Sequence, residues 1–197
     1  MTSTESEALL HTPGHVKHDG HNLTGFIIFL CSESIIFFAF FVGYGVLKIT
    51  APTWYPDNVT GIAVREPLIN TVILVSSSFV IYFAERYLHK KNYWGFRIVW
   101  FITMLMGSYF VYGQYVEWSE LTFSLSSGVF GGLFYLLTGF HGLHVITGIL
   151  LMGLMLYRSF IPGNYDKGEM GVESISLFWH FVDVIWIILF ILIYVWQ

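Results

Sequence analysis

The sequence has 197 residues, of which 55% are hydrophobic and 11% are charged, against roughly 25% charged residues in a soluble domain. This composition excludes an ordinary water-soluble globular fold and predicts an integral membrane protein. The net charge is −4 and the sequence has no block of basic residues, which argues against nucleic-acid partners. The single cysteine, Cys31, excludes an intrachain disulfide and a cysteine-based metal cluster.

Residues 1–22 form a polar, histidine-rich segment before the first apolar run. The segment lacks the basic start and apolar stretch of a signal peptide, so we expect it to stay attached and to lie in the cytoplasm. Its histidines are His11, His15, His18 and His21. Histidine-rich tracts sometimes bind metal ions, but the terminal position favours a solvated tail.

Five apolar stretches follow, and each is long enough to cross about 30 Å of hydrocarbon, which takes about 20 helical residues. In chain order they are residues 23–47, 67–88, 96–115, 128–157 and 174–196. The connectors between them contain Pro, Gly and Asn, which favour turns. The sequence therefore predicts an all-α, polytopic transmembrane bundle of five helices, with residues 23–197 as one membrane domain.

Basic residues are divided unevenly between the two ends of the predicted helices. The end that holds the N-terminus has Lys17, Arg86, Lys90, Lys91, Arg97, Arg158 and Lys167. The other end has only Lys48 and Arg65. Because basic residues accumulate on the cytoplasmic side of a membrane, we expect the N-terminus inside and the C-terminus outside.

Glu33 is the ionisable residue of the first predicted helix, about 14 Å from the helix start at a rise of 1.5 Å per residue. Ionisation at this depth is costly, so we expect a largely protonated carboxyl unless a buried partner offsets the desolvation. Such a group suits holding or passing protons. It equally suits a hydrogen bond to a neighbouring helix, and the residues alone leave both roles open.

Four more ionisable side chains fall within the predicted helices at i, i+3 spacing, which places each pair on one helix face. His141 and His144 lie in the fourth helix, and His180 and Asp183 lie in the fifth. With Glu33 they predict a polar layer across three helices. Imidazoles from two helices could ligate haem or a metal. Hydrogen bonds between helices are the favoured interpretation, because lipid offers these side chains no other partner.

Small residues in two predicted helices indicate close helix packing. The three serines at 76–78 are interpreted as a seam of small residues in the second helix. In the fourth helix, Gly139, Gly142 and Gly148 would let another helix approach closely.

The longest distinctive strings, LTFSLSSGVFGGLFYLLTGFHGLHVITG and SLFWHFVDVIWIILFILIYVW, resemble subunit III of cytochrome c oxidase. So do SESIIFF around Glu33 and GQYVEW from Gly113 to Trp118. The resemblance covers nearly everything after the histidine-rich tail. Related quinol oxidases share the WHF-x-D signature, but the TGFHGLHV and QYVEW strings are closer to the cytochrome c branch.

The resemblance implies a non-catalytic subunit III of an aa3-type cytochrome c oxidase. Such a chain binds no haem, copper or other metal and packs against catalytic subunit I and subunit II, in which haem and copper are expected. The resemblance also implies that Glu33 lies near the entrance of a proton-uptake pathway in the catalytic subunit. The chain would then support assembly, sustained turnover and proton uptake in aerobic electron transport.

The family commonly has seven helices, with phospholipid held in a cleft between a two-helix and a five-helix group. This sequence shows five helices, and Val42 and Val46 stand where a Trp and a His often follow the family's glutamate. Bound phospholipid and a bacterial-type plasma membrane or internal energy-transducing membrane are expected. The alternatives are subunit III of a quinol oxidase, a membrane haem protein, and a proton-coupled transporter that uses Glu33 and Asp183.

Overall fold

The computed structural model describes residues 19–56, 59, 61–163, 165 and 169–196. Of the features singled out in the sequence, His11, His15, Lys17, His18 and Lys167 lie outside the described residues, as does the side chain of His21.

The described residues form five long helices, and no strand occurs among them. The helices are α1 (Asp19–Thr50), α2 (Arg65–His89), α3 (Tyr93–Glu120), α4 (Gly128–Arg158) and α5 (Met170–Phe190), and α5 continues into a π-helical turn, η1 (Ile191–Val195). All five are long and apolar enough to cross a membrane. The prediction of an all-α transmembrane bundle is confirmed.

The observed helices extend beyond the apolar runs that mark them in the sequence. Helix α3 continues to Glu120, five residues past the predicted end at 115, and it begins at Tyr93 rather than at 96. Asn92 caps its start, because the Asn92 side chain accepts a hydrogen bond from the backbone N–H of Gly95 at 3.0 Å. Backbone hydrogen bonds do not require apolar side chains, so a helix continues past the hydrocarbon into the polar interface.

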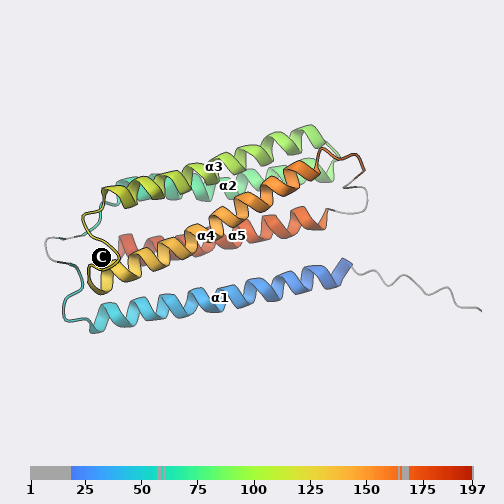
Figure 1. The fold of residues 1–197 in the computed structure, drawn as a ribbon. Helices are drawn as coiled ribbons and strands as arrows, with labels where there is room; N and C mark the ends of the chain where they lie inside the picture. The colour runs from blue at the N-terminus through green and yellow to red at the C-terminus, as the bar shows by residue number, and fades with distance from the viewer. Residues whose placement is uncertain (1–18, 57–58, 60, 164, 166–168, 197) are drawn as a thin grey trace, which may run out of the picture.

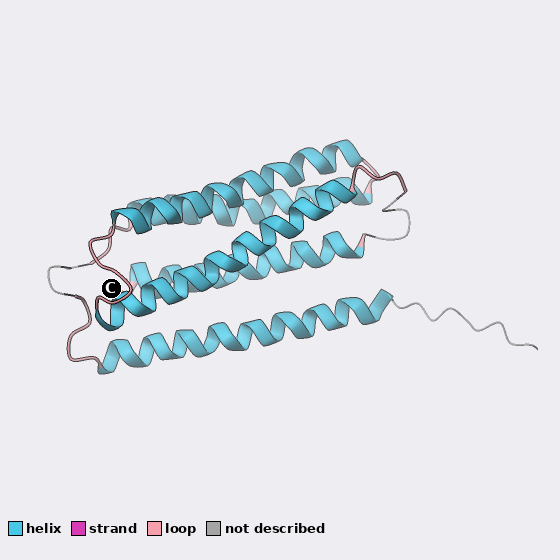
Figure 2. Cartoon of the chain, viewed as in Figure 1, coloured by secondary structure: helices cyan, strands magenta, loops and turns pink. Residues whose placement is uncertain are grey.

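The helices run antiparallel to their chain neighbours, and the connecting loops gather at the two ends of the bundle (Figures 1 and 2). Helices α2 and α3 form the most extensively packed pair. Helix α5 contacts α1, α2 and α4, whereas α1 lies along one side of the bundle against α4 and α5 (Figure 1). In the most apolar 18-residue stretch of each helix, 11% of the residues of α1 are buried, against 56% of those of α5. Helix α5 is therefore central and α1 peripheral.

The indole of Trp179 joins four helices in the core. This α5 side chain is fully buried, and its Nε1 donates a hydrogen bond to Ser77 Oγ of α2 at 2.8 Å. A Cβ atom added to Gly107 of α3 or Gly148 of α4 would lie 2.5 Å or 2.9 Å from the indole. The missing side chains at these glycines therefore make the space that the indole fills.

Candidate functional site

Glu33 of α1 and His144 of α4 meet between their helices. The distance from Glu33 Oε2 to His144 Nε2 is 3.2 Å, and the side chains are 17% and 14% exposed. The two residues stand 111 positions apart in the chain. The contact gives the intramembrane carboxyl the partner that its depth requires.

The other ring nitrogen of His144 fixes how protons are arranged in this pair. His144 Nδ1 lies 2.8 Å from the carbonyl oxygen of Phe140, one turn earlier in α4. A carbonyl only accepts, so Nδ1 carries the proton of the neutral ring and Nε2 is an acceptor. A hydrogen bond between Nε2 and Glu33 then requires one more proton, on either the carboxyl or the ring. The contact between Nε2 and Oε2 is therefore a hydrogen bond when a proton lies between these two atoms.

Aromatic rings enclose the imidazole of His144. The ring centroids of Phe37 and Phe140 lie 5.0 Å and 4.8 Å from the His144 ring, and Phe178 stacks at 6.2 Å. Phe37 is itself buried, at 1% exposure. These rings cover the side of the pair that faces the bundle core.

A second polar group joins α2 to α5. Ser78 Oγ donates a hydrogen bond to Asp183 Oδ2 and lies 2.9 Å from His180 Nδ1. Asp183 is buried at 3% exposure, and its Oδ1 has no hydrogen-bond partner among the described residues. Ser77 and Ser78 are thus hydrogen-bond partners of α5 as well as small packing residues. Ser78 donates to Asp183, and Ser77 accepts from Trp179.

His141 stands apart from both groups. Its ring is fully buried and lies 4.9 Å from the indole of Trp186 and 5.9 Å from the ring of Phe110. Neither ring nitrogen has a hydrogen-bond partner in the described part of the chain. Residues three apart in a helix differ by about 60° in direction, which is enough to point His141 into the core while His144 faces α1. The five predicted residues therefore lie in three separate groups of contacts.

A third group, at the end of α3, was not predicted as a site. Glu117 Oε1 accepts a hydrogen bond from Tyr194 of η1 at 2.7 Å, and Oε2 accepts from Gln114 at 2.8 Å. The sequence signal was present in the string GQYVEW, where a carboxyl follows an amide by three residues on one helix face. Tyr194 could not be paired with it from sequence, because 77 residues separate Tyr194 from Glu117.

One cluster in the described residues brings three metal-ligand atoms within 4.8 Å of one another: His89, Glu169 and Glu173, at the opposite end of the bundle from Glu117. His89 Nδ1 already pairs with Glu169 Oε2 at 2.6 Å, and His89 and Glu173 are exposed. The cluster is explained as a surface ion pair between the end of α2 and the start of α5.

Taken together, the fold and these interhelical groups define an integral, multi-pass helical membrane protein in which a carboxyl and an imidazole meet between the peripheral helix α1 and helix α4. The chain matches the family model described as cytochrome c oxidase subunit III over residues 4–197. This chain belongs to the cytochrome c oxidase subunit III family. The resemblance stated from the sequence is confirmed, and the chain is accordingly a subunit that assembles with other oxidase subunits.

Relatives from distant organisms support the same assignment. The chain is 40% identical over 189 residues to cytochrome c oxidase subunit 3 of Synechocystis sp., which covers 93% of this chain and 81% of that protein. It is 42% identical over 180 residues to the Thermostichus vulcanus protein, and the match covers 91% of this chain and 89% of that protein. It is 36% identical over 179 residues to the Oryctolagus cuniculus protein, and the match covers 87% of this chain and 68% of that protein.

Proposed function

We propose that this chain is the non-catalytic subunit III of an aa3-type cytochrome c oxidase and supports assembly, sustained turnover and proton uptake by catalytic subunit I. The observation that supports the proposal is the Glu33–His144 pair, an acid and a base in contact between two membrane-spanning helices. An acid and a base that exchange one proton can store it and return it. They need no redox group to do so.

The position of the pair fits a supporting role. Glu33 lies on the peripheral helix α1, and its side chain keeps 17% exposure on the outside of the bundle. Ile35, Phe38 and Val42 of the same helix are large, apolar and exposed. These three residues point to the side of α1 away from Glu33, at about 100° per residue, and we assign this outer face to contact with subunit I and membrane lipid. Subunit II completes the expected complex.

The cytochrome c branch is favoured over the quinol branch. The relatives described above are named cytochrome c oxidase subunit 3, and the QYVEW string provides the Glu117 carboxyl that joins α3 to η1. Reduced cytochrome c should drive oxygen consumption by the purified complex, whereas a quinol should not. The enzyme would reside in a bacterial-type plasma membrane or an internal energy-transducing membrane.

Copurification tests the assignment directly. The tagged chain, extracted in mild detergent, should bring with it a haem-containing partner, and the chain stripped from that complex should carry no visible pigment. A stripped chain that keeps a haem absorption band would contradict the proposal and favour a membrane haem protein.

Replacing His141 and His144 with Asn is expected to leave the haem spectrum of the assembled oxidase unchanged. His144 uses both ring nitrogens for Phe140 and Glu33, and the His141 ring packs against Trp186 at an angle of 30°. The measurement is the reduced-minus-oxidised absorption spectrum per assembled enzyme, with His89→Asn at the exposed end of α2 as the control. A band lost per enzyme in the double variant alone would identify a haem ligand in this chain.

Cysteine labelling should place the end of the bundle that holds the α2–α3 connection in the cytoplasm. The described basic residues at that end are Arg86, Lys90, Lys91, Arg97 and Arg158, and their accumulation is typical of a cytoplasmic side. In a Cys31→Ser background, a membrane-impermeant maleimide added to intact cells should label Ser126→Cys, in the exposed loop before α4, and not Lys90→Cys. Labelling at Lys90→Cys alone would reverse the proposed orientation.

A further inference from the structure

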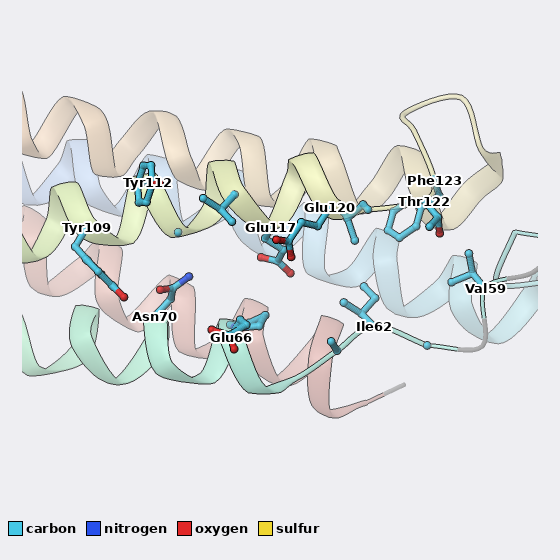
Figure 3. Close-up of a pocket in the computed structure, with 16 residues that line it drawn as sticks. Val59, Ile62, Glu66, Asn70, Tyr109, Tyr112, Glu117, Glu120, Thr122 and Phe123 are labelled. Atoms are coloured by element: carbon cyan, nitrogen blue, oxygen red, sulfur yellow. The ribbon is translucent and has the colours of Figure 1, made fainter.

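Two carboxyls of the bundle differ in how protons can reach them. Glu117 of α3 faces a cleft of about 520 Å³ between α2 and α3, at the end of the bundle where α2 begins (Figure 3). The cleft gives Glu117 contact with the surrounding medium. Asp183 of α5 does not line this cleft and is buried at 3% exposure. A proton can therefore reach Asp183 only by way of the groups packed around it.

Asp183 is a buried carboxyl without a counter-charge. No salt bridge among the described residues includes it. Its Oδ1 has no hydrogen-bond partner in the same part of the chain, and its Oδ2 accepts from Ser78. A lone carboxylate is costly inside a membrane protein, because neither lipid nor an apolar core solvates it. The Ser78 hydroxyl is thus the described side chain that connects Asp183 to other polar groups.

The Ser78 hydroxyl lies between two ionisable side chains of α5. It donates to Asp183 Oδ2, and its oxygen lies 2.9 Å from His180 Nδ1. His180 and Asp183 are three residues apart, so both can face α2 from one side of α5. A serine hydroxyl both donates and accepts hydrogen bonds. It can therefore pass a proton from one of these side chains to the other.

The three groups have two complete hydrogen-bond arrangements. When Ser78 donates to an ionised Asp183, its contact with His180 is a hydrogen bond in which Nδ1 donates. When Asp183 carries the proton, Asp183 donates to Ser78, and Ser78 donates to Nδ1. The change from the first arrangement to the second moves one proton from Nδ1 through the hydroxyl to the carboxyl. If His180 takes up another proton at Nε2, the ring stays neutral and the net result is one proton added to Asp183.

Glu85 marks the outer end of this path. It lies on α2 seven residues after Ser78, which is two helical turns, on the same face and about 10 Å closer to the end of the helix. Glu85 interacts electrostatically with His180, and both side chains are partly exposed. A negative charge raises the local concentration of protons beside the imidazole. The four residues thus form a series from a partly exposed carboxyl to a buried one.

We propose that Asp183 exchanges a proton with the end of the bundle that holds the α2–α3 connection, through Ser78 and His180, and that Glu85 attracts the proton to His180. This path lies between α2 and α5 and is separate from the acid–base pair between α1 and α4. It therefore does not depend on the function proposed for that pair. A hydrogen bond that only ties α2 to α5 would need Ser78 and Asp183, whereas exchange also requires the imidazole.

Hydrogen–deuterium exchange at the Asp183 carboxyl tests the path in the purified oxidase complex. The infrared absorption of a protonated C=O group shifts when deuterium replaces the proton, and the band that is lost in Asp183→Asn identifies this carboxyl. Ser78→Ala and His180→Asn should each slow the exchange by at least about tenfold, since a positioned proton-transfer group typically contributes about 10²–10⁴-fold. Glu85→Gln should slow it by a smaller factor, because only the attraction of its charge is lost.

Two serine variants are matched controls for Ser78→Ala. Ser76→Ala also removes one hydroxyl from α2, but Ser76 Oγ donates to the carbonyl oxygen of Val72 in its own helix. This variant should leave the exchange rate unchanged. Ser78→Thr keeps a hydroxyl at the position between the imidazole and the carboxyl, and it should retain the native rate.

Asp183→Glu keeps the measurement possible if Asp183→Asn does not assemble, because the longer acid shifts the band without removing it. The proposed path would be overturned by the absence of an Asp183 band or by a native complex that does not exchange. It would also be overturned if Ser78→Ala, His180→Asn or Glu85→Gln failed to slow the exchange. These rates do not report on Glu33, so a negative result here leaves the function proposed for the chain standing.

Discussion

Replacing Glu33 with Gln is expected to yield an assembled, active oxidase whose proton uptake and durability under sustained turnover decline at alkaline pH. The glutamine amide can still donate a hydrogen bond to His144 Nε2, so the contact between α1 and α4 is kept. The amide cannot release a proton, so the pair no longer stores one. Because free protons are scarce at high pH, the loss of a storage group shows there first.

The size of the effect separates a supporting group from a catalytic one. We expect less than about a tenfold decrease in proton uptake, well short of the roughly 10²–10⁴-fold loss typical when a general acid or base is removed. Proton uptake by the enzyme in vesicles and the number of turnovers before inactivation are the two measurements, with Glu173→Gln as the control. Complete loss of oxygen reduction in assembled enzyme would make Glu33 catalytic, and unchanged values at every pH would make it merely structural.

Replacing Trp179 with Ala is expected to cost about 3–5 kcal/mol of unfolding free energy. The indole contacts the space left by Gly107 and Gly148 and donates to Ser77, so its removal opens a cavity among four helices and leaves the Ser77 hydroxyl without that donor. In lipid the cost comes mainly from lost packing contacts, because the surrounding hydrocarbon is as apolar as the core.

Unfolding in mixed micelles of a maltoside and dodecyl sulfate measures this free energy. The control is Trp94→Ala, because Trp94 lies near the start of α3 with 70% exposure; that variant should change stability by less than about 0.5 kcal/mol. If both variants unfolded at the same detergent fraction, the central role given to Trp179 would be wrong. Ser77→Ala should lie between them, at about 1–3 kcal/mol, because the buried N–H of Trp179 loses its acceptor.

The sequence by itself determined the number of helices and their approximate limits. A bilayer requires about 20 apolar residues for each crossing, so the five runs could be counted without knowing how they pack. The same physics made Glu33 conspicuous, because a carboxyl in an apolar run is costly wherever its helix lies. Long, distinctive strings such as WHFVDVIW indicated the family, and comparison with relatives confirmed it.

Only the tertiary structure decided which polar groups meet. A helix in lipid is apolar on nearly every face, so its sequence carries little periodic signal for the side that faces a neighbour. The rotation of α4 about its axis sends His144 to Glu33 and His141 to Trp186, although the two histidines are three residues apart. Ser78 and Asp183 are 105 positions apart in the chain. Their pairing depends on how α2 and α5 pack, and packing is a property of helix pairs that no single segment encodes.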